Sequence, residues 1–265
     1  MARCRTRSSA ARRLPSGRGA GKLTESVDGE PRIASNPPLI ERLSDLAPAG
    51  EAENLHEALR NLLRSYRRTL QPDRRRLLER FRYVDAARKV VGVGSVGTRA
   101  WIVLLLGKDN NDPLFIQAKE AESSVLEPYV GKSEFANHGQ RVVEGQRLMQ
   151  AASDIMLGWL HTTGLDGVER DFYARQLWDS KGSALVDLME PEVLTAYARL
   201  CGETLAKAHA RSGDTVAIAS YLGTSDVFDQ SLAAFAETYA DQNERDYDAL
   251  KQAVASGRLE AKAGL

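Results

Sequence analysis

One glycine-rich stretch restricts the fold of this chain more than any other part of its sequence. Gly92, Gly94 and Gly97 form a G-x-G-x-x-G motif between two apolar, β-branched runs. A dinucleotide-binding fold requires a helix directly after the third glycine, so that the helix N-terminus faces a pyrophosphate. Here the motif runs into residues 100–106, whose β-branched and aromatic content and closing Gly107 predict a strand. The sequence therefore predicts a glycine hairpin between two strands and argues against a dinucleotide-binding fold.

Strand, glycine loop and strand is the arrangement with which protein kinases cover the phosphates of ATP. Such a site needs backbone N–H groups near the phosphates, a lysine on the next strand and a glutamate that holds the lysine. Lys119 lies on a predicted strand over residues 114–121, and Glu144 lies on a predicted helix from about residue 140 to 156. Ser95, at the tip of the loop, can add a hydroxyl donor. We therefore predict a nucleotide site from six residues: Gly92, Gly94, Ser95, Gly97, Lys119 and Glu144.

Each of these residues also has a simpler interpretation. The glycines are equally typical of a tight hairpin between twisted strands. Lys119 can be a solvated strand lysine paired with Glu122. Glu144 can pair with Arg141 or Arg147 along its own helix, which is worth about 0.2–0.5 kcal/mol. The three features in this order are more specific than any one of them, and they favour a nucleotide site.

Two further pairs of residues are weaker candidates. Gln176 and Leu177 end a predicted strand over residues 171–178, where a kinase hinge would offer backbone groups to adenine, although a plain edge strand fits equally well. His209 and Asp214 resemble an acid/base and metal pair. No Asn follows them at the expected spacing, and a helix dipole alone favours a histidine at a helix C-terminus. The sequence contains no HExxH, CxxC, GxSxG or P-loop motif.

Hydrophobic periodicity divides the chain into four segments. Residues 1–38 are rich in Arg, Ser, Gly and Pro and poor in aliphatic side chains, so we predict a disordered basic tail. Residues 39–83 predict a helical segment, and residues 84–183 predict a glycine-loop, strand-rich lobe with one long helix. Residues 184–265 predict a helical lobe, in which one helix begins at Pro191 and ends near Gly213. Strands followed by helices indicate an α+β fold.

Charge and composition exclude several classes of protein. The chain holds 36 basic and 36 acidic residues, but residues 1–22 contain seven Lys or Arg and no acid, so the remainder carries a net charge of −7. An acidic body argues against a nucleic-acid partner. No apolar run reaches the roughly 18 residues that a membrane span requires, and the basic start lacks a secretory signal's apolar core. Cys4 and Cys201 provide neither a zinc site nor a disulfide framework, which predicts a reducing, cytoplasmic location.

Taken together, these segments resemble one bacterial family, domain-of-unknown-function family 2252. Its members look like distant relatives of the protein-kinase and aminoglycoside-phosphotransferase superfamily. The resemblance covers about residues 32–257 and is carried by six segments: Val90–Arg99, Gln117–Ala121, Gly139–Gln150, Arg175–Gly182, Leu205–Asp214 and Phe235–Asp241. It implies a protein-kinase-like α+β fold, with an antiparallel sheet lobe followed by a helical lobe, and ATP as the ligand.

The chain also departs from the family pattern. The resemblance implies a G-D-x-H-x-x-N segment and an N-D-F-D segment upstream of the glycine loop, and nothing in residues 1–88 matches either. We therefore expect an incomplete fold, the C-terminal half of a family member, in which Mg²⁺ binds only if another segment supplies its ligand.

These observations predict a kinase-like fragment that binds ATP and is not catalytically competent alone. At most it is a phosphotransferase that lacks its catalytic-loop segment. The alternatives are a non-catalytic interaction module whose incomplete apolar face is covered by a second protein chain, or a truncated gene product without independent function. No motif indicates the phosphate acceptor.

Overall fold

The computed structural model describes residues 23–47, 52–92, 97–177 and 184–261. The chain divides into two compact units, Met1–Leu188 and Met189–Leu265, and each is described here by itself. The first unit contains the strands and the glycine stretch. The second is helical. The predicted α+β class is therefore confirmed.

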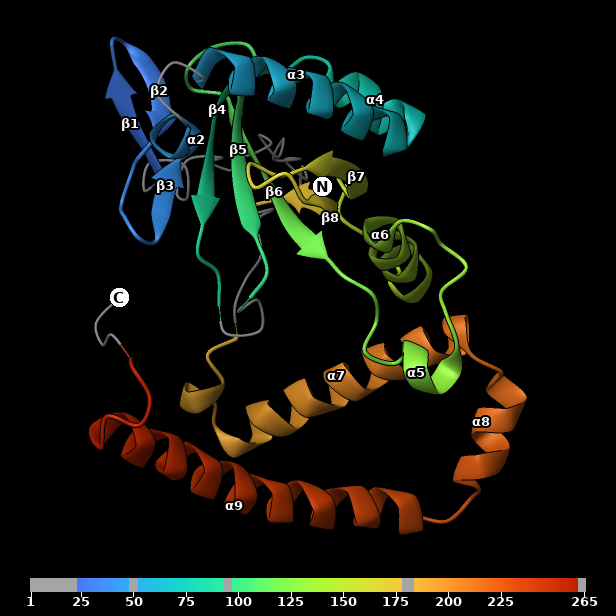
Figure 1. Ribbon diagram of the computed structural model, residues 1–265. Coiled ribbons are helices and arrows are strands. Elements are labelled where there is room, and N and C mark those ends of the chain that lie inside the picture. Colours follow the sequence, from blue (N-terminus) through green and yellow to red (C-terminus); the bar gives the residue numbers. More distant parts are fainter. Residues whose placement is uncertain (1–22, 48–51, 93–96, 178–183, 262–265) are drawn as a thin grey trace, which may run out of the picture. The chain divides into compact units, whose positions relative to one another are not determined.

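The first unit is built on a six-stranded antiparallel sheet with the strand order β3-β4-β5-β6-β8-β7 (Figure 1). The glycine stretch connects two neighbouring strands of this sheet, β4 and β5, as predicted. The next strand, β6, pairs with β5 on one side and with β8 on the other. The six strands are β3 (Ile40–Arg42), β4 (Arg82–Lys89), β5 (Ala100–Leu106), β6 (Pro113–Ala121), β7 (Gly158–Thr163) and β8 (Glu169–Gln176).

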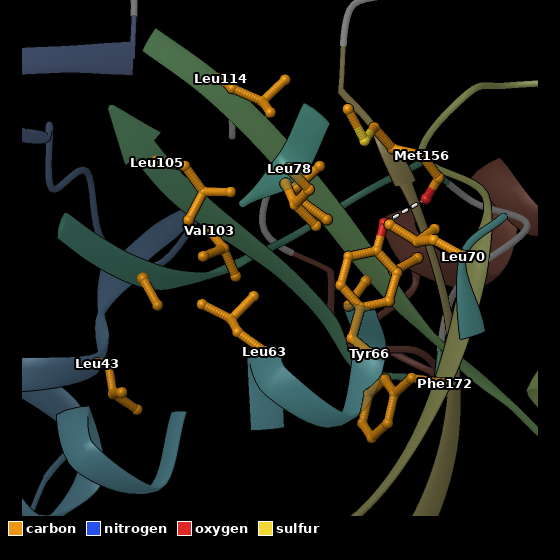
Figure 2. Packing of buried hydrophobic residues seen from close by; sticks show 14 residues of the cluster. Leu43, Leu63, Tyr66, Leu70, Leu78, Val103, Leu105, Leu114, Met156 and Phe172 are labelled. Carbon is orange, nitrogen blue, oxygen red and sulfur yellow. Dashed lines mark hydrogen bonds between the residues drawn. The ribbon is translucent and has the colours of Figure 1, made fainter. Parts of the chain in front are cut away.

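Helix α3 (Ala52–Thr69) and the short helix α4 (Pro72–Leu78) pack on one face of the sheet (Figure 1). Leucines recur along α3 at helical spacing, and Figure 2 shows its Leu63 and Tyr66 meeting side chains of the strands. The Tyr66 hydroxyl, fully buried, donates a hydrogen bond to the carbonyl oxygen of Met156. We call this side of the sheet the helix face. Its strand residues include Val103, Ile116, Ala118, Phe172 and Ala174.

The opposite side of the sheet carries Lys119. Residues paired across antiparallel strands point to the same side, and alternate residues of one strand share a side. Lys119 pairs with Ala100 and with Tyr173, and Gln117 pairs with Arg175. We call this side the lysine face. Farther from Lys119, it packs against the β1–β2 hairpin through residues that include Ile33, Ile102, Leu104 and Phe115.

Helix α6 (His138–Met149) follows β6 in the chain and packs against β6, β7 and β8. A Cβ atom at Gly139 would lie 2.1 Å from the carbonyl oxygen of Phe172, so only glycine allows this close approach to β8. The guanidinium of Arg147 lies 5.8 Å from the ring centroid of Trp159, which is in register with Tyr173. Helix α6 therefore reaches the lysine face.

The predicted disordered tail is wrong for part of its length. Strands β1 (Thr24–Val27) and β2 (Glu30–Ile33) form a hairpin, and residues 1–22 lie outside the described part. Asp28 and Gly29 occupy the turn with φ of 52° and 79°. Asp-Gly is the residue pair that such a two-residue turn favours, so the sequence carried the signal.

One helix boundary also differs from the prediction. The helix expected to run to residue 156 ends at Met149, and it buries Val143 at its centre. Met156 instead lies in the connection to β7, where it packs beneath Tyr66. The remaining short helices of the first unit are α2 (Leu43–Leu46), α5 (Glu127–Val130) and the 3₁₀ turn η2 (Val186–Leu188).

The second unit consists of α7 (Pro191–Ser212), α8 (Thr215–Leu222) and α9 (Val227–Ala255). Helix α7 begins at a proline and is followed by Gly213, as predicted, whereas α8 was not predicted. Among the described residues of this unit only Ala253 is buried. None of the described helices is long and apolar enough to cross a membrane.

Candidate functional site

Lys119 is partly buried on the lysine face. Burial, and then repulsion from Arg175, lowers the pKa of its ammonium group below the ordinary lysine value. Within the described part of the chain, Lys119 forms no ion pair. It is therefore a cation whose charge no described residue neutralises.

Arg175 and Gln117 lie next to this lysine. Because Gln117 pairs with Arg175 and Lys119 pairs with Tyr173, Arg175 is a diagonal neighbour of Lys119 on the same face. Gln117 is buried, with 5% of the residue exposed. The described part of the lysine face thus places two cations next to each other.

Glu144 does not meet Lys119 in this structure. Its Oε1 accepts a hydrogen bond from Arg147 Nη1 at 3.0 Å, one turn further along α6. Arg147 also donates to the carbonyl oxygen of Leu157 at 2.8 Å, which fixes the guanidinium on the side of the helix away from solvent. Of the interpretations that the sequence allowed, the pair within the helix is the one observed.

The glycine hairpin is described on both sides of its tip. The predicted site residues Gly94 and Ser95 lie outside the described residues. Gly97 has φ of +87°, a conformation that favours glycine, whereas Gly92 shows no such angle. No described atom lies within 4 Å of the position that a Cβ would take at Gly92 or Gly97. The space beside these glycines is open.

A buried ion cluster holds the base of the hairpin. Glu120, whose side chain is 6% exposed, accepts from the backbone N–H of Arg99 at 2.9 Å and from Arg170 Nε at 3.1 Å. Asp166 binds both arginines, Arg99 at 2.8 Å and Arg170 at 2.7 Å. The hydrogen bond from Arg170 is the main cause of the lowered pKa of Asp166. Sequence reasoning missed this cluster because its members come from four segments that are separate in the chain: the hairpin connection, strand β6, the β7–β8 turn and strand β8.

Gln176 and Leu177 do not offer free donors to an adenine ring. The N–H of Gln176 donates to the carboxylate of Asp154, at 3.2 and 3.3 Å to its two oxygens. The N–H of Leu177 donates to the carbonyl oxygen of Phe115 at 2.8 Å. The described part of this segment therefore continues the sheet, as the simpler interpretation allowed.

His209 and Asp214 occupy helix termini. The carboxylate of Asp214 accepts from the N–H groups of Val216 and Ala217 at 2.9 and 3.0 Å and so caps α8. His209 lies in the last turn of α7, and its carbonyl oxygen accepts from Gly213. The described residues hold no group of three or more His, Cys, Asp or Glu side chains that could bind a metal ion. Acid/base catalysis by this pair has no support in the structure.

The architecture and the site define an α+β protein with a glycine hairpin and an unneutralised pair of cations on one face of its antiparallel sheet. Residues 2–253 match the family DUF2252, described as an uncharacterized protein conserved in bacteria, and the chain belongs to this family. The match begins nearer to the N-terminus than the predicted residue 32. No curated protein and no solved structure matches the chain.

Proposed function

We propose that the lysine face binds the phosphates of ATP beneath the glycine hairpin, in the manner of a protein kinase. The order of the elements along the chain supports the proposal. The hairpin between β4 and β5, the lysine on β6 and the helix α6 follow one another, and the helix packs against the sheet that holds these strands. Kinases place a glycine-rich loop, a strand lysine and a helix glutamate in this sequence. The open space at Gly92 and Gly97 leaves room for a ligand against the backbone.

The observation that carries the proposal is the unneutralised pair of Lys119 and Arg175. Two cations on one face, with no acidic partner among the described residues, repel each other unless an anion lies between them. Ionisable groups with shifted pKa values are concentrated at functional sites, so a pair of cations that repel each other is a candidate for binding an anion. A phosphate group has the charge and the acceptor oxygens to satisfy both side chains.

The proposal concerns binding and does not include phosphoryl transfer. Transfer requires Mg²⁺ ligands and a group that orients the acceptor. The described residues assemble neither, and Asp214 is occupied as a helix cap. We therefore propose that Mg²⁺ participates only if another segment supplies an acidic ligand.

Thermal unfolding with and without ATP tests the proposal. A ligand at a hundredfold excess over its Kd stabilises the folded state by about 2.7 kcal/mol, which corresponds to about 5–10 °C in Tm for a chain of this size. We expect Lys119→Met to abolish this shift. Lys108→Met, in the exposed turn between β5 and β6, is the matched control and should leave it unchanged. The absence of a shift with any nucleotide, with or without Mg²⁺, would refute the proposal.

A second candidate function is a non-catalytic interaction module. The helices of the second unit leave many large apolar side chains exposed, among them Leu205, Phe235 and Tyr239. Apolar surface of this extent marks interaction sites in soluble proteins. Sedimentation that shows a monomer, together with no binding of an apolar dye, would count against this function.

A further inference from the structure

We propose that the first unit binds a small, mainly apolar molecule in a cavity between α3 and the helix face of the sheet. The cavity has a volume of about 430 Å³, and all of its lining residues belong to the first unit. Small-molecule sites in proteins typically measure about 300–1,000 Å³ and are lined mainly by apolar side chains. The cavity meets both conditions.

Two elements form the walls. Helix α3 supplies leucines and Tyr66, and the strands supply aliphatic and aromatic side chains opposite them (Figure 2). Ala118 on β6 and Ala174 on β8 pair with each other across the strands. Because both side chains are small, the surface of the sheet is recessed at this point of the cavity. The main apolar lining residues are Leu55, Leu59, Leu63, Trp101, Ile116 and Leu160.

Water is a poor occupant of this space, because the apolar walls offer it few hydrogen-bond partners. An α-helix with its side chains is about 10–12 Å across, so about 430 Å³ corresponds to roughly one helical turn and is small for a folded protein segment. A small molecule whose apolar body contacts these walls suits the space best.

The opening of the cavity determines the head group of the ligand. The charged residues that line it are Arg88, Arg99, Arg170 and Asp166. The three arginines are matched by three acids, because Arg88 pairs with Glu41 and the other two share Glu120 and Asp166. Thr162, which pairs with Arg170 across the strands, and Thr163 also line the cavity. A balanced rim favours a single uncharged polar end, so the class of ligand is an aliphatic molecule of medium length with one hydroxyl-like head.

This cavity is separate from the proposed nucleotide site. Its floor is the helix face, whereas Lys119 and Arg175 point to the opposite side of the sheet. The two proposals therefore fail independently of each other.

Titration of the full chain with hexan-1-ol and octan-1-ol, followed by tryptophan fluorescence, tests the proposal. Trp101 lines the cavity and reports on its occupation, so the signal should be saturable and should be lost in Trp101→Phe. Because burying one methylene is worth about 0.8 kcal/mol, affinity should rise about fourfold per added methylene. A signal that does not saturate, or affinity that ignores chain length, would overturn the proposal.

Cavity-filling variants locate the binding. Ala118→Leu fills the cavity from the sheet and Leu59→Phe fills it from α3, and each should weaken octanol binding by at least about tenfold because it removes the free volume. The matched control Ala236→Leu, exposed on α9, should bind like the wild type. Unchanged affinity in both filling variants would overturn the assignment. Octanoate tests the rim: octanol binding at least as tightly as octanoate supports an uncharged head, and tighter binding of octanoate contradicts it.

Discussion

Replacing Lys119 by methionine should stabilise the folded protein when no ligand is present. The substitution keeps the length of the side chain and removes a partly buried charge that has no acidic partner among the described residues. It also ends the repulsion from Arg175, the second cause of the lowered pKa of Lys119. A residue retained for binding often lowers stability in this way.

The geometry of the sheet sets the size of the effect. Diagonal neighbours on adjacent strands lie about 7–8 Å apart. At this distance two unit charges repel by about 0.6 kcal/mol in water and by about 2 kcal/mol at an effective dielectric constant of about 20. Lys119 is only partly buried, so solvent screens the repulsion and the gain lies near the lower value, about 0.5–1 kcal/mol, or about 1–4 °C in Tm.

Thermal unfolding at low and at high salt measures this gain, with Lys108→Met as the control. The difference between Lys119→Met and the wild type should shrink as salt screens the repulsion. It should also shrink at alkaline pH. The folded state releases the Lys119 proton more readily than the unfolded chain does, so the penalty disappears as pH rises through the lowered pKa. A clear loss of stability in Lys119→Met would refute the reasoning and would indicate a Lys119–Glu144 pair in solution.

Three further substitutions test the fold and the weaker site candidates by thermal or denaturant unfolding. Tyr66→Phe removes the buried hydrogen bond to Met156 and should cost about 1–2 kcal/mol. Because burial raises the pKa of Tyr66 above its ordinary value of 10.0, the wild type should lose stability as pH rises above about 10, and the variant should lose less. Glu120→Gln removes one of the two carboxylates that Arg99 and Arg170 share and leaves them Asp166, so it should cost about 1–3 kcal/mol, whereas a change below about 0.5 kcal/mol would contradict the role of Glu120 in the cluster. Asp214→Ala should cost about 0.5–2 kcal/mol through the lost helix cap and leave any nucleotide binding unchanged, and a loss of binding would restore Asp214 as a site residue.

Local signals predicted much of the fold. The glycine hairpin, β6 and the start of α7 follow from alternation, turn residues and a helix-starting proline, all of which act over a few residues. The Asp28-Gly29 turn carried an equally local signal, but the surrounding composition was given more weight and the β1–β2 hairpin was missed.

Nonlocal contacts decided what the sequence could not show. Glu144 lies on the helix that the periodicity predicted. The sequence alone did not show which residue would pair with it, and in the structure its partner is Arg147, one turn away on the same helix. Arg175 is a neighbour of Lys119 because of the register between β6 and β8, and no sequence motif predicts that register. The ion cluster around Glu120 likewise requires two strands, β6 and β8, and two connections to meet in space.

The most direct test of the nucleotide proposal is the chemical reactivity of Lys119 with and without ATP. Its lowered pKa should make Lys119 react with an amine-selective acylating reagent faster than the exposed Lys108, as mass spectrometry of the modified peptides would show. If phosphate binds between Lys119 and Arg175, saturating ATP should slow the acylation of Lys119 several-fold and leave that of Lys108 unchanged. Equal reactivity of Lys119 in the presence and absence of ATP would contradict the proposal.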